Sequence, residues 1–369
     1  MKLLYVVPNL NNGGGVARVL SIKTNFLIEK FGYEVHILTQ NHGNSSLFYS
    51  FNEKIILHDM ILEGANFQFL NNYRKSLNKQ VASINPDIII VCDNGLKAFT
   101  VPFILNSKTP IIFECHGSRF MEENVTNDMF FSNFLRKLKY SFKFFGASKF
   151  NKIITLSEEN REEWSKKNSI VIPNPIWFST AKEADLSQKN VISVGRHTYE
   201  KGFDRLLEIW KKVIVKFPDW NLTIYGKSNP DFDLIALAKK LNIENNITFH
   251  EPIKNINEKY LEASIYLMPS RFEGFGMVLI EAMASGLPCI SYDCPCGPRA
   301  IIKDNYNGFL IENGNENEFV KTVSNLIDNE NLRIQIGKNS KESVNKYDID
   351  EIMNLWDKLF TELVFKKNN

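Results

Sequence analysis

The chain has 369 residues, a length that suits two domains of roughly 100–200 residues better than a single hydrophobic core. Hydrophobic residues make up 44% and charged residues 23%, which is typical of a globular protein and excludes a disordered chain. The net charge of +2 lacks the strong positive field of a nucleic-acid-binding protein, so we expect no nucleic acid partner.

The apolar run at the N-terminus covers only residues 3–7 and ends at Pro8, which predicts a first strand rather than a signal peptide. No segment approaches the ~20 apolar residues of a membrane span. The five cysteines are an odd number, and four lie in or beside apolar runs, as reduced thiols do. We therefore expect a cytoplasmic protein, at most peripheral at the inner face of the cytoplasmic membrane.

Short runs of Val, Ile and Leu recur through the first half of the chain, and segments of helical spacing separate most of them. Such runs are typical of strands buried on both faces. Alternation of strands and helices predicts an α/β domain with a parallel, doubly wound sheet. The expected strands are Leu3–Val7, Val35–Thr39, Lys54–His58, Asp87–Val91, Ile111–Glu114, Ile153–Leu156 and Ile170–Ile172, and the expected helices include Val16–Glu29, Phe69–Ser83 and Phe131–Phe145.

Two prolines at 173 and 175 and a polar stretch to Asn190 interrupt this pattern and predict a hinge. A second α/β series follows, so we expect domains at 1–174 and 175–350 and a closing helix, 351–369, that returns toward the first domain. The two domains should face each other across a cleft, with ligands at the carboxyl ends of the strands. The expected strands are Val191–Val194, Leu222–Tyr225, Ile247–His250, Ile265–Met268, Cys289–Tyr292 and Phe309–Ile311, and the last helices are Glu316–Asn329, Leu332–Asn345 and Ile349–Phe365.

The most informative segment is Ser270–Pro288, which follows a predicted strand and opens a helix near Gly276. Its glycines allow close approach of a ligand to the backbone, and the helix N-terminus offers free N–H groups that suit a diphosphate. Glu273 lies on the loop, and Glu281 lies about one and a half turns into the helix. Both carboxylates can accept hydrogen bonds from sugar hydroxyls.

This string resembles the E-x7-E signature of glycosyltransferase family 4, whose members are retaining enzymes of the GT-B fold with two Rossmann-like domains. The resemblance implies that Glu273 faces the donor sugar and that Glu281 binds the ribose of the nucleotide. Capping of a helix is the alternative explanation of the two glutamates. The implied donor-binding residues of this segment are Glu273, Gly274, Phe275, Gly276, Met277, Val278 and Glu281.

A second motif, Val194–Gly202, lies at the first strand-to-helix turn of the second domain. Arg196 can clamp a phosphate, and Lys201 adds a point charge. Its spacing resembles the glycine-arginine and lysine-glycine pair that holds the donor diphosphate in the same family. Arg196 and Lys201 are therefore expected to bind the donor and to stabilise the leaving group. Otherwise they are solvated cations, with Glu200 as the nearest ionic partner.

The first domain offers a glycine-rich turn after its first strand, at Asn12–Arg18. It lacks the G-x-G-x-x-G pattern of dinucleotide sites, so it gives little support to a dinucleotide-binding site. In the family that the chain resembles, a glycine-rich loop here covers the donor phosphate and the acceptor. We expect Gly14 and Gly15 to bind the donor, unless the segment is only a tight turn.

His116 directly follows a predicted strand end, and the family places a histidine at a comparable position beside the donor sugar. The expected catalytic residues are thus His116, Arg196, Lys201 and Glu273, although a lone histidine is often structural. Glu114 lies nearby as a weaker candidate. Asp93 and Arg119 are candidates for binding the acceptor, and Asp93 also suits a turn.

No obligatory metal or cofactor is expected. The triplet Asp231-Phe232-Asp233 resembles a metal-binding D-x-D motif, but it precedes a helical pattern and is explained as an N-terminal cap. The spacing of Cys294-Pro-Cys296 is too short for a zinc knuckle. One departure from the family lies at Ala300, where many members carry a glutamate; Arg299 is a possible substitute for its polar contacts.

Residues 134–145 mix aromatic side chains with four cations. The segment could contact an anionic membrane surface, where lipid-linked acceptors reside, or its aromatic stripe could face the core. The partners expected overall are a nucleotide-sugar donor and a saccharide or lipid-linked acceptor.

The sequence predicts a retaining glycosyltransferase that uses a UDP-sugar, or second a GDP-sugar, in surface polysaccharide or lipopolysaccharide assembly. No carboxylate stands out as an obligatory covalent nucleophile, which agrees with reaction on one face of the sugar. Two alternatives stay open: a UDP-sugar 2-epimerase on the same fold, and a non-catalytic subunit that binds nucleotide sugars.

Overall fold

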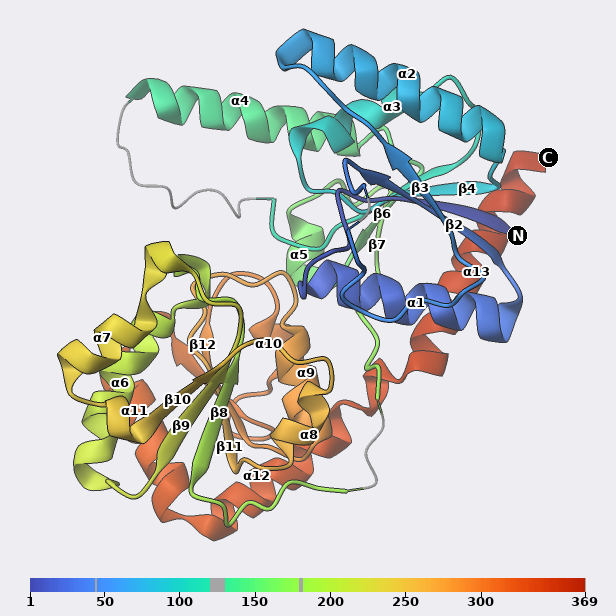
Figure 1. The fold of residues 1–369 in the computed structure, drawn as a ribbon. Coiled ribbons are helices and arrows are strands. Elements are labelled where there is room, and N and C mark those ends of the chain that lie inside the picture. Colours follow the sequence, from blue (N-terminus) through green and yellow to red (C-terminus); the bar gives the residue numbers. More distant parts are fainter. Residues whose placement is uncertain (44, 120–129, 179–181, 369) are drawn as a thin grey trace. The chain divides into compact units, whose positions relative to one another are not determined.

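The computed structural model describes residues 1–43, 45–119, 130–178 and 182–368. The chain divides into two compact units (Figure 1). The first unit contains Met1–Pro175 and Asp350–Asn369, and the second contains Ile176–Ile349. Residues 179–181 of the predicted polar stretch lie outside the described part of the chain.

The described residues of the first unit form a seven-stranded sheet of order β3-β2-β1-β4-β5-β6-β7, in which every pair of neighbours is parallel. The order reverses between β1 and β4, as in Rossmann-like folds. The strands are β1 (Lys2–Val6), β2 (Glu34–Gln40), β3 (Ile56–Met60), β4 (Ile88–Val91), β5 (Ile111–Glu114), β6 (Lys152–Thr155) and β7 (Ser169–Val171). The helices are α1 (Gly15–Phe31), α2 (Asn66–Ile84), α3 (Val101–Ile104), α4 (Phe130–Ala147), α5 (Glu158–Glu162) and α13 (Ile349–Asn368).

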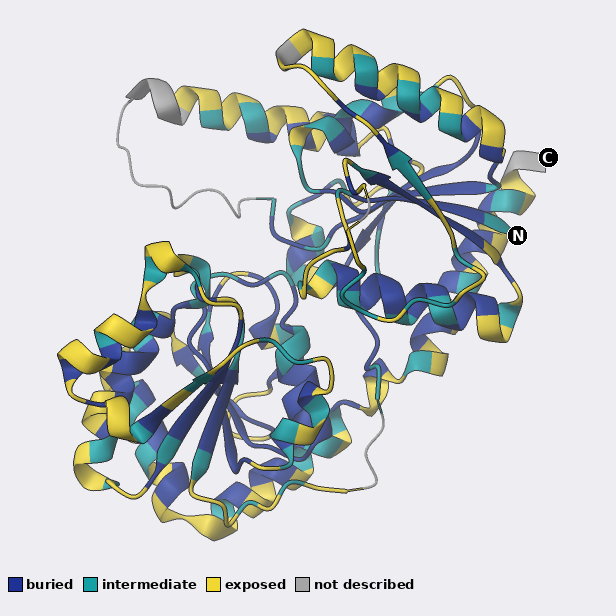
Figure 2. Ribbon diagram, in the orientation of Figure 1, coloured by how far each residue is buried: buried dark blue, intermediate teal, exposed yellow. Residues whose placement is uncertain are grey.

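Helices cover both faces of this sheet, with α2, α3 and α4 on one face and α1 and α13 on the other (Figure 1). The Val, Ile and Leu side chains of the central strands are therefore buried on both faces, as the continuous apolar runs predict. Leu4, Val91 and Phe113 of the strands pack with Tyr73 of α2 in one core cluster. Figure 2 shows these strands buried and the outward sides of the helices exposed.

Strand β3 starts two residues later than the sequence predicts. The prediction of Lys54–His58 fails at its start because Asn52 holds the chain in a turn: its side chain accepts a hydrogen bond from the Lys54 amide at 3.0 Å, and its carbonyl accepts one from the Ile55 amide at 3.0 Å. This local side-chain hydrogen bond competes with strand pairing. As the edge strand, β3 also leaves Ile56 and Leu57 exposed.

The described residues of the second unit form a six-stranded parallel sheet of order β10-β9-β8-β11-β12-β13, which repeats the Rossmann-like reversal between its first and fourth strands. Trp210, Phe203 and Phe319 lie in its core, and the Trp210 indole donates to the Asn246 carbonyl at 2.8 Å. The strands are β8 (Asn190–Val194), β9 (Asn221–Tyr225), β10 (Ile247–His250), β11 (Ile265–Met268), β12 (Cys289–Asp293) and β13 (Phe309–Glu312). The helices are α6 (Phe203–Lys216), α7 (Leu234–Leu241), α8 (Ile256–Tyr260), α9 (Met277–Ala284), α10 (Pro298–Ile301), α11 (Glu316–Asp328) and α12 (Glu330–Ser343).

Candidate functional site

Two loops meet at the carboxyl edge of the second sheet. Strands β8 and β11 are neighbours, so the segments that follow them emerge side by side. The Lys201 Nζ atom lies 2.6 Å from Glu273 Oε1, and the Ser270 hydroxyl donates to the same oxygen at 2.7 Å. The fold thus joins two predicted site residues that lie 72 positions apart in the sequence.

Arg271 fixes the two loops to each other, a role that the sequence analysis missed. Its guanidinium binds both carboxylate oxygens of Asp204, at 2.8 and 2.6 Å, and donates to the Tyr199 carbonyl at 2.7 Å. Its backbone amide donates to the Glu200 carbonyl at 2.8 Å. A bidentate pair of this kind restricts geometry as well as adding energy. The Lys201 segment is therefore held in place.

Glycine is required at two points of this edge. Gly202 has φ +68°, and a Cβ atom there would lie 2.2 Å from the Pro269 carbonyl oxygen, which no side chain tolerates. Gly276 has φ +93° and precedes the first residue of α9. Both positions need the left-handed backbone region that glycine adopts at little cost.

The first amides of α9 are available for an anion. The N–H groups of Met277 and Val278 meet no acceptor among the residues that the structure describes, as the first turn of a helix leaves them. Gly274 beside them is partly exposed, whereas Gly276 is buried. Phe275 is only 3% exposed, and its ring packs edge-on against Tyr347 with the ring centroids 5.5 Å apart, so the ring is not available to a ligand.

Glu281 is a buried carboxylate, with 4% of its surface exposed. Trp177 donates its indole N–H to one oxygen at 2.8 Å, and the Tyr260 hydroxyl donates to the other at 3.2 Å. These neutral donors orient the carboxylate without cancelling its charge. Nothing in the sequence singled out Trp177 or Tyr260, because they lie 104 and 21 residues away from Glu281.

Arg196 lies at the surface, with 61% of its side chain exposed, and binds Glu200 at 2.9 Å. Glu200 is the ionic partner expected under the alternative that Arg196 and Lys201 are solvated cations. His197, which was not predicted, is buried next to it, and its Nε2 atom has no hydrogen-bond partner in the described structure. Burial lowers the pKa of His197, partly offset by Glu251.

The segment with Ala300 has its own hydrogen bonds. Arg299 binds both oxygens of Asp293, at 2.8 and 2.6 Å, so its guanidinium is committed to that carboxylate. The Ala300 carbonyl accepts from the Tyr347 hydroxyl at 3.3 Å. To replace the polar contacts of the family's glutamate, Arg299 would therefore have to give up its ion pair with Asp293.

The D-x-D triplet has a structural explanation. Asp233 caps α7 and accepts a hydrogen bond from the Ala236 amide at 2.9 Å, as the sequence predicts. Asp231 lies in a short turn that the Asn229 side chain caps. Cys294 and Cys296 are both buried.

In the first unit the glycine-rich turn leads into α1. Gly14 is the residue before the helix, and Gly15 is its first residue. The Asn12 side chain accepts from the Gly14 amide at 2.9 Å, so a Cβ atom at Gly14 would lie 2.6 Å from that oxygen. Nothing lies within 4 Å of a Cβ atom at Gly15. The turn is thus an ordered start of α1. A Cβ atom would clash at Gly14 but would meet open space at Gly15.

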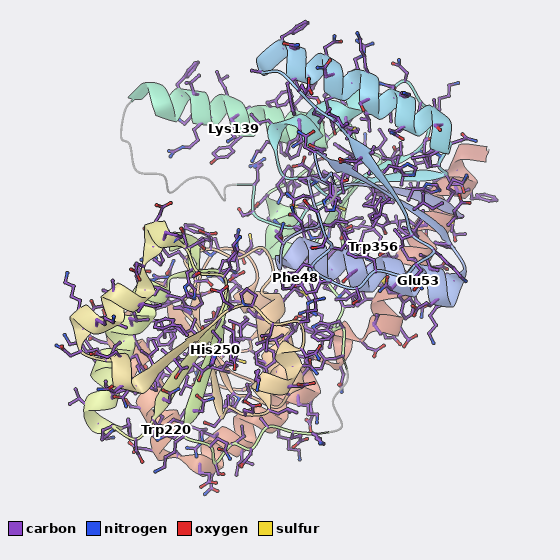
Figure 3. The ribbon with its side chains drawn as sticks, in the orientation of Figure 1. Phe48, Glu53, Lys139, Trp220, His250 and Trp356 are labelled. Atoms are coloured by element: carbon purple, nitrogen blue, oxygen red, sulfur yellow. The ribbon has the colours of Figure 1, made fainter. Side chains whose placement is uncertain are left out.

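Glu114, at the end of β5, forms a fully buried ion pair with Lys23 of α1 at 2.5 Å. The exposed fractions of the two side chains are 0% and 1%. The Lys23 ammonium also lies 3.5 Å from the ring centroid of Trp356 of α13, labelled in Figure 3. Burial alone would raise the pKa of Glu114, but the charges of Lys23 and His116 and hydrogen bonds from Lys23 and Cys92 hold it below its ordinary value.

His116 lies against this pair. Its side chain is 5% exposed, and Nε2 lies 3.4 Å from Glu114 Oε1. Burial lowers the pKa of His116, Glu114 opposes that shift, and Lys23 adds to it. The imidazole is therefore neutral near pH 7. Cys92, Glu114 and His116 place three ligand-type atoms within 4.8 Å of one another.

The two candidates for acceptor binding have structural partners. Asp93 accepts from the Gly95 amide at 2.7 Å and pairs with Lys97 at 3.1 Å, which is the turn-forming alternative. The Arg119 amide donates to Glu163 at 2.6 Å, and its guanidinium lies 5.2 Å from the Phe144 ring centroid.

Helix α4 presents apolar side chains to solvent. The expectation of a core-facing aromatic stripe is wrong for most of them, although Tyr140 is buried. Lys139, labelled in Figure 3, is one of four cations on this helix, which has no acidic residue. The exposed side chains, each at least 37% accessible, are Phe134, Leu135, Leu138, Phe142, Phe144 and Phe145. Across the described ranges, no helix combines the length and apolar character needed to cross a membrane.

Comparison with known proteins agrees with this geometry. Residues 178–343 match the family model "Glycosyl transferases group 1". An uncharacterized glycosyltransferase of Haemophilus influenzae is 32% identical over 363 residues, covering 96% of this chain and 98% of that protein. The amylovoran biosynthesis glycosyltransferase AmsD of Erwinia amylovora is 29% identical over 366 residues, covering 96% and 98%.

Among solved structures, a Staphylococcus aureus TarM variant in complex with fondaparinux, alpha-GlcNAc-glycerol and UDP superimposes with a TM-score of 0.78 at 16% identity. The match covers 97% of this chain and 99% of that one. The prediction of a GT-B fold with two Rossmann-like domains is thereby confirmed. The chain belongs to the glycosyltransferases.

Proposed function

We propose that this enzyme transfers a hexosyl group, with retention of configuration, from a nucleoside diphosphate sugar to an acceptor hydroxyl in surface polysaccharide or lipopolysaccharide assembly. The proposal includes membership of glycosyltransferase family 4. The observation that carries it is the meeting of Lys201, Glu273 and the free amides of α9 at one edge of the second sheet. A cation and free N–H groups suit a diphosphate, and a carboxylate beside them suits sugar hydroxyls.

Lys201 would exchange partners during the reaction. Its ammonium is bound to Glu273, but 21% of the side chain is exposed, so an incoming diphosphate can reach it. When the glycosidic bond breaks, negative charge grows on the leaving oxygen, and a preorganised cation there stabilises the transition state. Exposed Arg196 would add a second cation at the diphosphate.

Glu273 and Glu281 would recognise the two sugars of the donor. Glu273 is 7% exposed and oriented by Ser270, which suits hydrogen bonding to the transferred sugar. Glu281, held by Trp177 and Tyr260, would accept from the ribose. Neutral His116 would contribute a hydrogen bond to the transfer step. UDP is our first choice of nucleotide and GDP the second, since TarM was crystallised with UDP.

The test is a thermal-shift screen with UDP, GDP, ADP and their sugars, followed by an assay for nucleotide release. A ligand at ~100 times its dissociation constant should stabilise the protein by about 2.7 kcal/mol. We expect one nucleotide family to shift the transition in wild type but not in Glu281→Ala. Asn315→Ala is a matched control, because it removes a helix cap elsewhere in the second unit. Binding without turnover on any acceptor would favour a non-catalytic subunit, and epimer formation without acceptor would favour the epimerase.

We also propose that transfer needs no obligatory metal ion. Cys92, Glu114 and His116 are the ligand-type cluster found among the described residues, but the Lys23 ammonium 2.5 Å from Glu114 already supplies the positive charge there. A divalent ion would have to displace it or bear its repulsion. Turnover should survive EDTA, and a loss that added Mg²⁺ or Mn²⁺ restores would contradict this.

Helix α4 supports a further proposal, that the enzyme works at the inner face of the cytoplasmic membrane. Exposed Phe134, Leu135 and Leu138 beside cations suit an anionic bilayer surface. Co-sedimentation with phosphatidylglycerol vesicles should fall in Leu138→Glu. Ile235→Glu, at an exposed apolar position of the second unit, is the control. Equal loss in both variants would mean general charge repulsion.

A further inference from the structure

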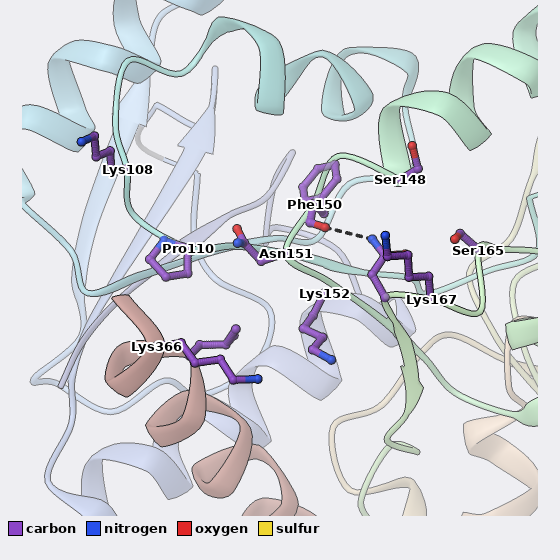
Figure 4. A pocket seen from close by; sticks show the side chains of 11 residues that line it. Lys108, Pro110, Ser148, Phe150, Asn151, Lys152, Ser165, Lys167 and Lys366 are labelled. Atoms are coloured by element: carbon purple, nitrogen blue, oxygen red, sulfur yellow. Dashed lines mark hydrogen bonds between the residues drawn. The ribbon is translucent and has the colours of Figure 1, made fainter. Parts of the chain in front are cut away.

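The first unit holds a lysine-lined pocket on the sheet edge opposite Glu114 and His116. Pro110 directly precedes β5, Lys152 begins β6, and Asn168 directly precedes β7. The pocket therefore opens at the amino ends of three neighbouring strands. Its volume of about 740 Å³ lies within the range of small-molecule sites. Leu363 and Lys366 of α13 also line it, and Lys366 is labelled in Figure 4.

Four lysines line this pocket, and none of its 11 lining residues is acidic. They come from four separate segments of the chain, as Figure 4 shows: the loop before β5, the start of β6, the loop before β7 and the end of α13. The four are Lys108, Lys152, Lys167 and Lys366.

None of these four ammonium groups has an ion-pair partner within the described ranges, whereas many other lysines do. Acidic residues are not scarce, since the chain has 42 Asp and Glu against 44 Lys and Arg. Like charges gathered around one cavity repel one another, and that repulsion is relieved when an anion enters. The arrangement thus has the electrostatics of a receptor for several negative charges.

The remaining polar groups of the pocket favour phosphate oxygens as the occupant. The Ser165 hydroxyl makes no hydrogen bond in the described structure, so it can donate to a ligand. Asn168 donates its amide to the Phe150 carbonyl at 2.9 Å, and Asn151 accepts from the Ile111 amide at 2.8 Å. These bonds fix the backbone that carries Lys152 and Lys167. Lysine binds phosphate as a point charge with three donors.

We propose that the lysine pocket is a second binding site, separate from the donor edge of the second unit, for a ligand that carries two or more phosphate groups. A single phosphate would leave most of the volume and most of the charges unused. The phosphates can come from a free nucleoside diphosphate or from a phosphodiester-linked glycan chain, because the same ammonium groups recognise both.

The test uses inorganic tripolyphosphate with the full chain, by isothermal titration calorimetry and by amide chemical-shift mapping at low and high salt. We expect shifts at Asn151, Lys152 and Asn168, and an affinity that falls as salt rises. The double variant Lys152→Gln/Lys366→Gln should lose at least about tenfold in affinity. The double variant Lys75→Gln/Lys79→Gln removes the same charge from exposed positions of α2 and should lose less than about twofold.

Three results would overturn the site: no binding by wild type, equal losses in the two double variants, or shifts confined to the Lys201 loop. Two competition arms then identify the source of the phosphates. Displacement of tripolyphosphate from the pocket by UDP points to the nucleotide, and displacement by a glycerol phosphate oligomer points to a phosphodiester glycan. Failure of both competitors to displace it would overturn the assignment to either source. The test does not measure glycosyl transfer activity. The pocket proposal can therefore be contradicted while the proposed function holds, and the proposed function can be contradicted while the pocket proposal holds.

Discussion

Each unit of this protein places a lysine–glutamate ion pair at the carboxyl edge of its sheet, and the two pairs differ in burial. Lys23 and Glu114 of the first unit are 1% and 0% exposed, whereas Lys201 and Glu273 of the second are 21% and 7% exposed. The first pair is sealed by Trp356 and cannot exchange its partners without local unfolding. The second can open toward a ligand. The same chemistry therefore serves architecture in one unit and substrate binding, as we propose, in the other.

A third pair extends the comparison, because Arg196 and Glu200 are 61% and 36% exposed. If burial sets how much such a pair contributes to stability, breaking the pair should destabilise the protein most for Lys23, less for Lys201 and least for Arg196. Effects on turnover should instead be large only for pairs that a donor can reach.

Breaking the buried pair should have the largest effect on stability. Lys23→Met leaves Glu114 buried without its cation, which costs about 3–5 kcal/mol. Hydrogen exchange of the α1 amides in the full chain should accelerate, while that of the β8 amides stays near wild type. The double variant Lys23→Met/Glu114→Gln removes both charges and should recover most of the loss. A double variant as unstable as the single one would mean that Lys23 acts through packing on Trp356 instead.

Lys201→Ala should separate function from stability. Turnover should fall by about 10²–10³ because the cation at the leaving group is lost. The free energy of unfolding should fall by only about 1 kcal/mol, since Ser270 still donates to Glu273. Steady-state release of nucleotide and chemical denaturation measure the two quantities. Near-normal turnover would remove Lys201 from the proposed site.

The buried pair should also give the first unit a dependence on acid. The pKa of Glu114 lies below its ordinary 4.5 in the folded state, so its contribution to stability is complete above pH 4.5 and is lost as the pH falls through the lowered value. The difference in unfolding free energy between wild type and Glu114→Gln should therefore be constant above pH 4.5 and should shrink as the pH falls from 4.5 into the acid range. A constant difference across that range would show that the carboxylate is not ionised in the folded state.

The exposed pair should matter least. Glu200→Gln removes the carboxylate that binds Arg196, and exposed pairs contribute only about 0.2–1 kcal/mol. We expect an unchanged melting temperature within error and an equal or slightly tighter affinity for nucleotide, because Arg196 is released. A marked loss of stability would contradict burial as the deciding variable.

The sequence was sufficient for the alternation of strands and helices, because buried parallel strands need continuous apolar runs. It also placed Glu273 on the loop before a helix and Glu281 within that helix, and it explained Asp233 as a cap. It failed locally at β3, where the side chain of Asn52 outcompeted the strand pattern.

The identity of partners was decided by the tertiary structure. Lys23 with Trp356, Arg271 with Asp204 and Trp177 with Glu281 join residues from distant parts of the chain, and no sequence motif contains both members of any of these pairs. A motif specifies residue types at short spacing, whereas an ion pair depends on which strands become neighbours and how deeply the pair is buried. The sequence by itself determined that cations and carboxylates follow these strands; only the fold decided which of them pair, and whether water or a ligand can reach the pair.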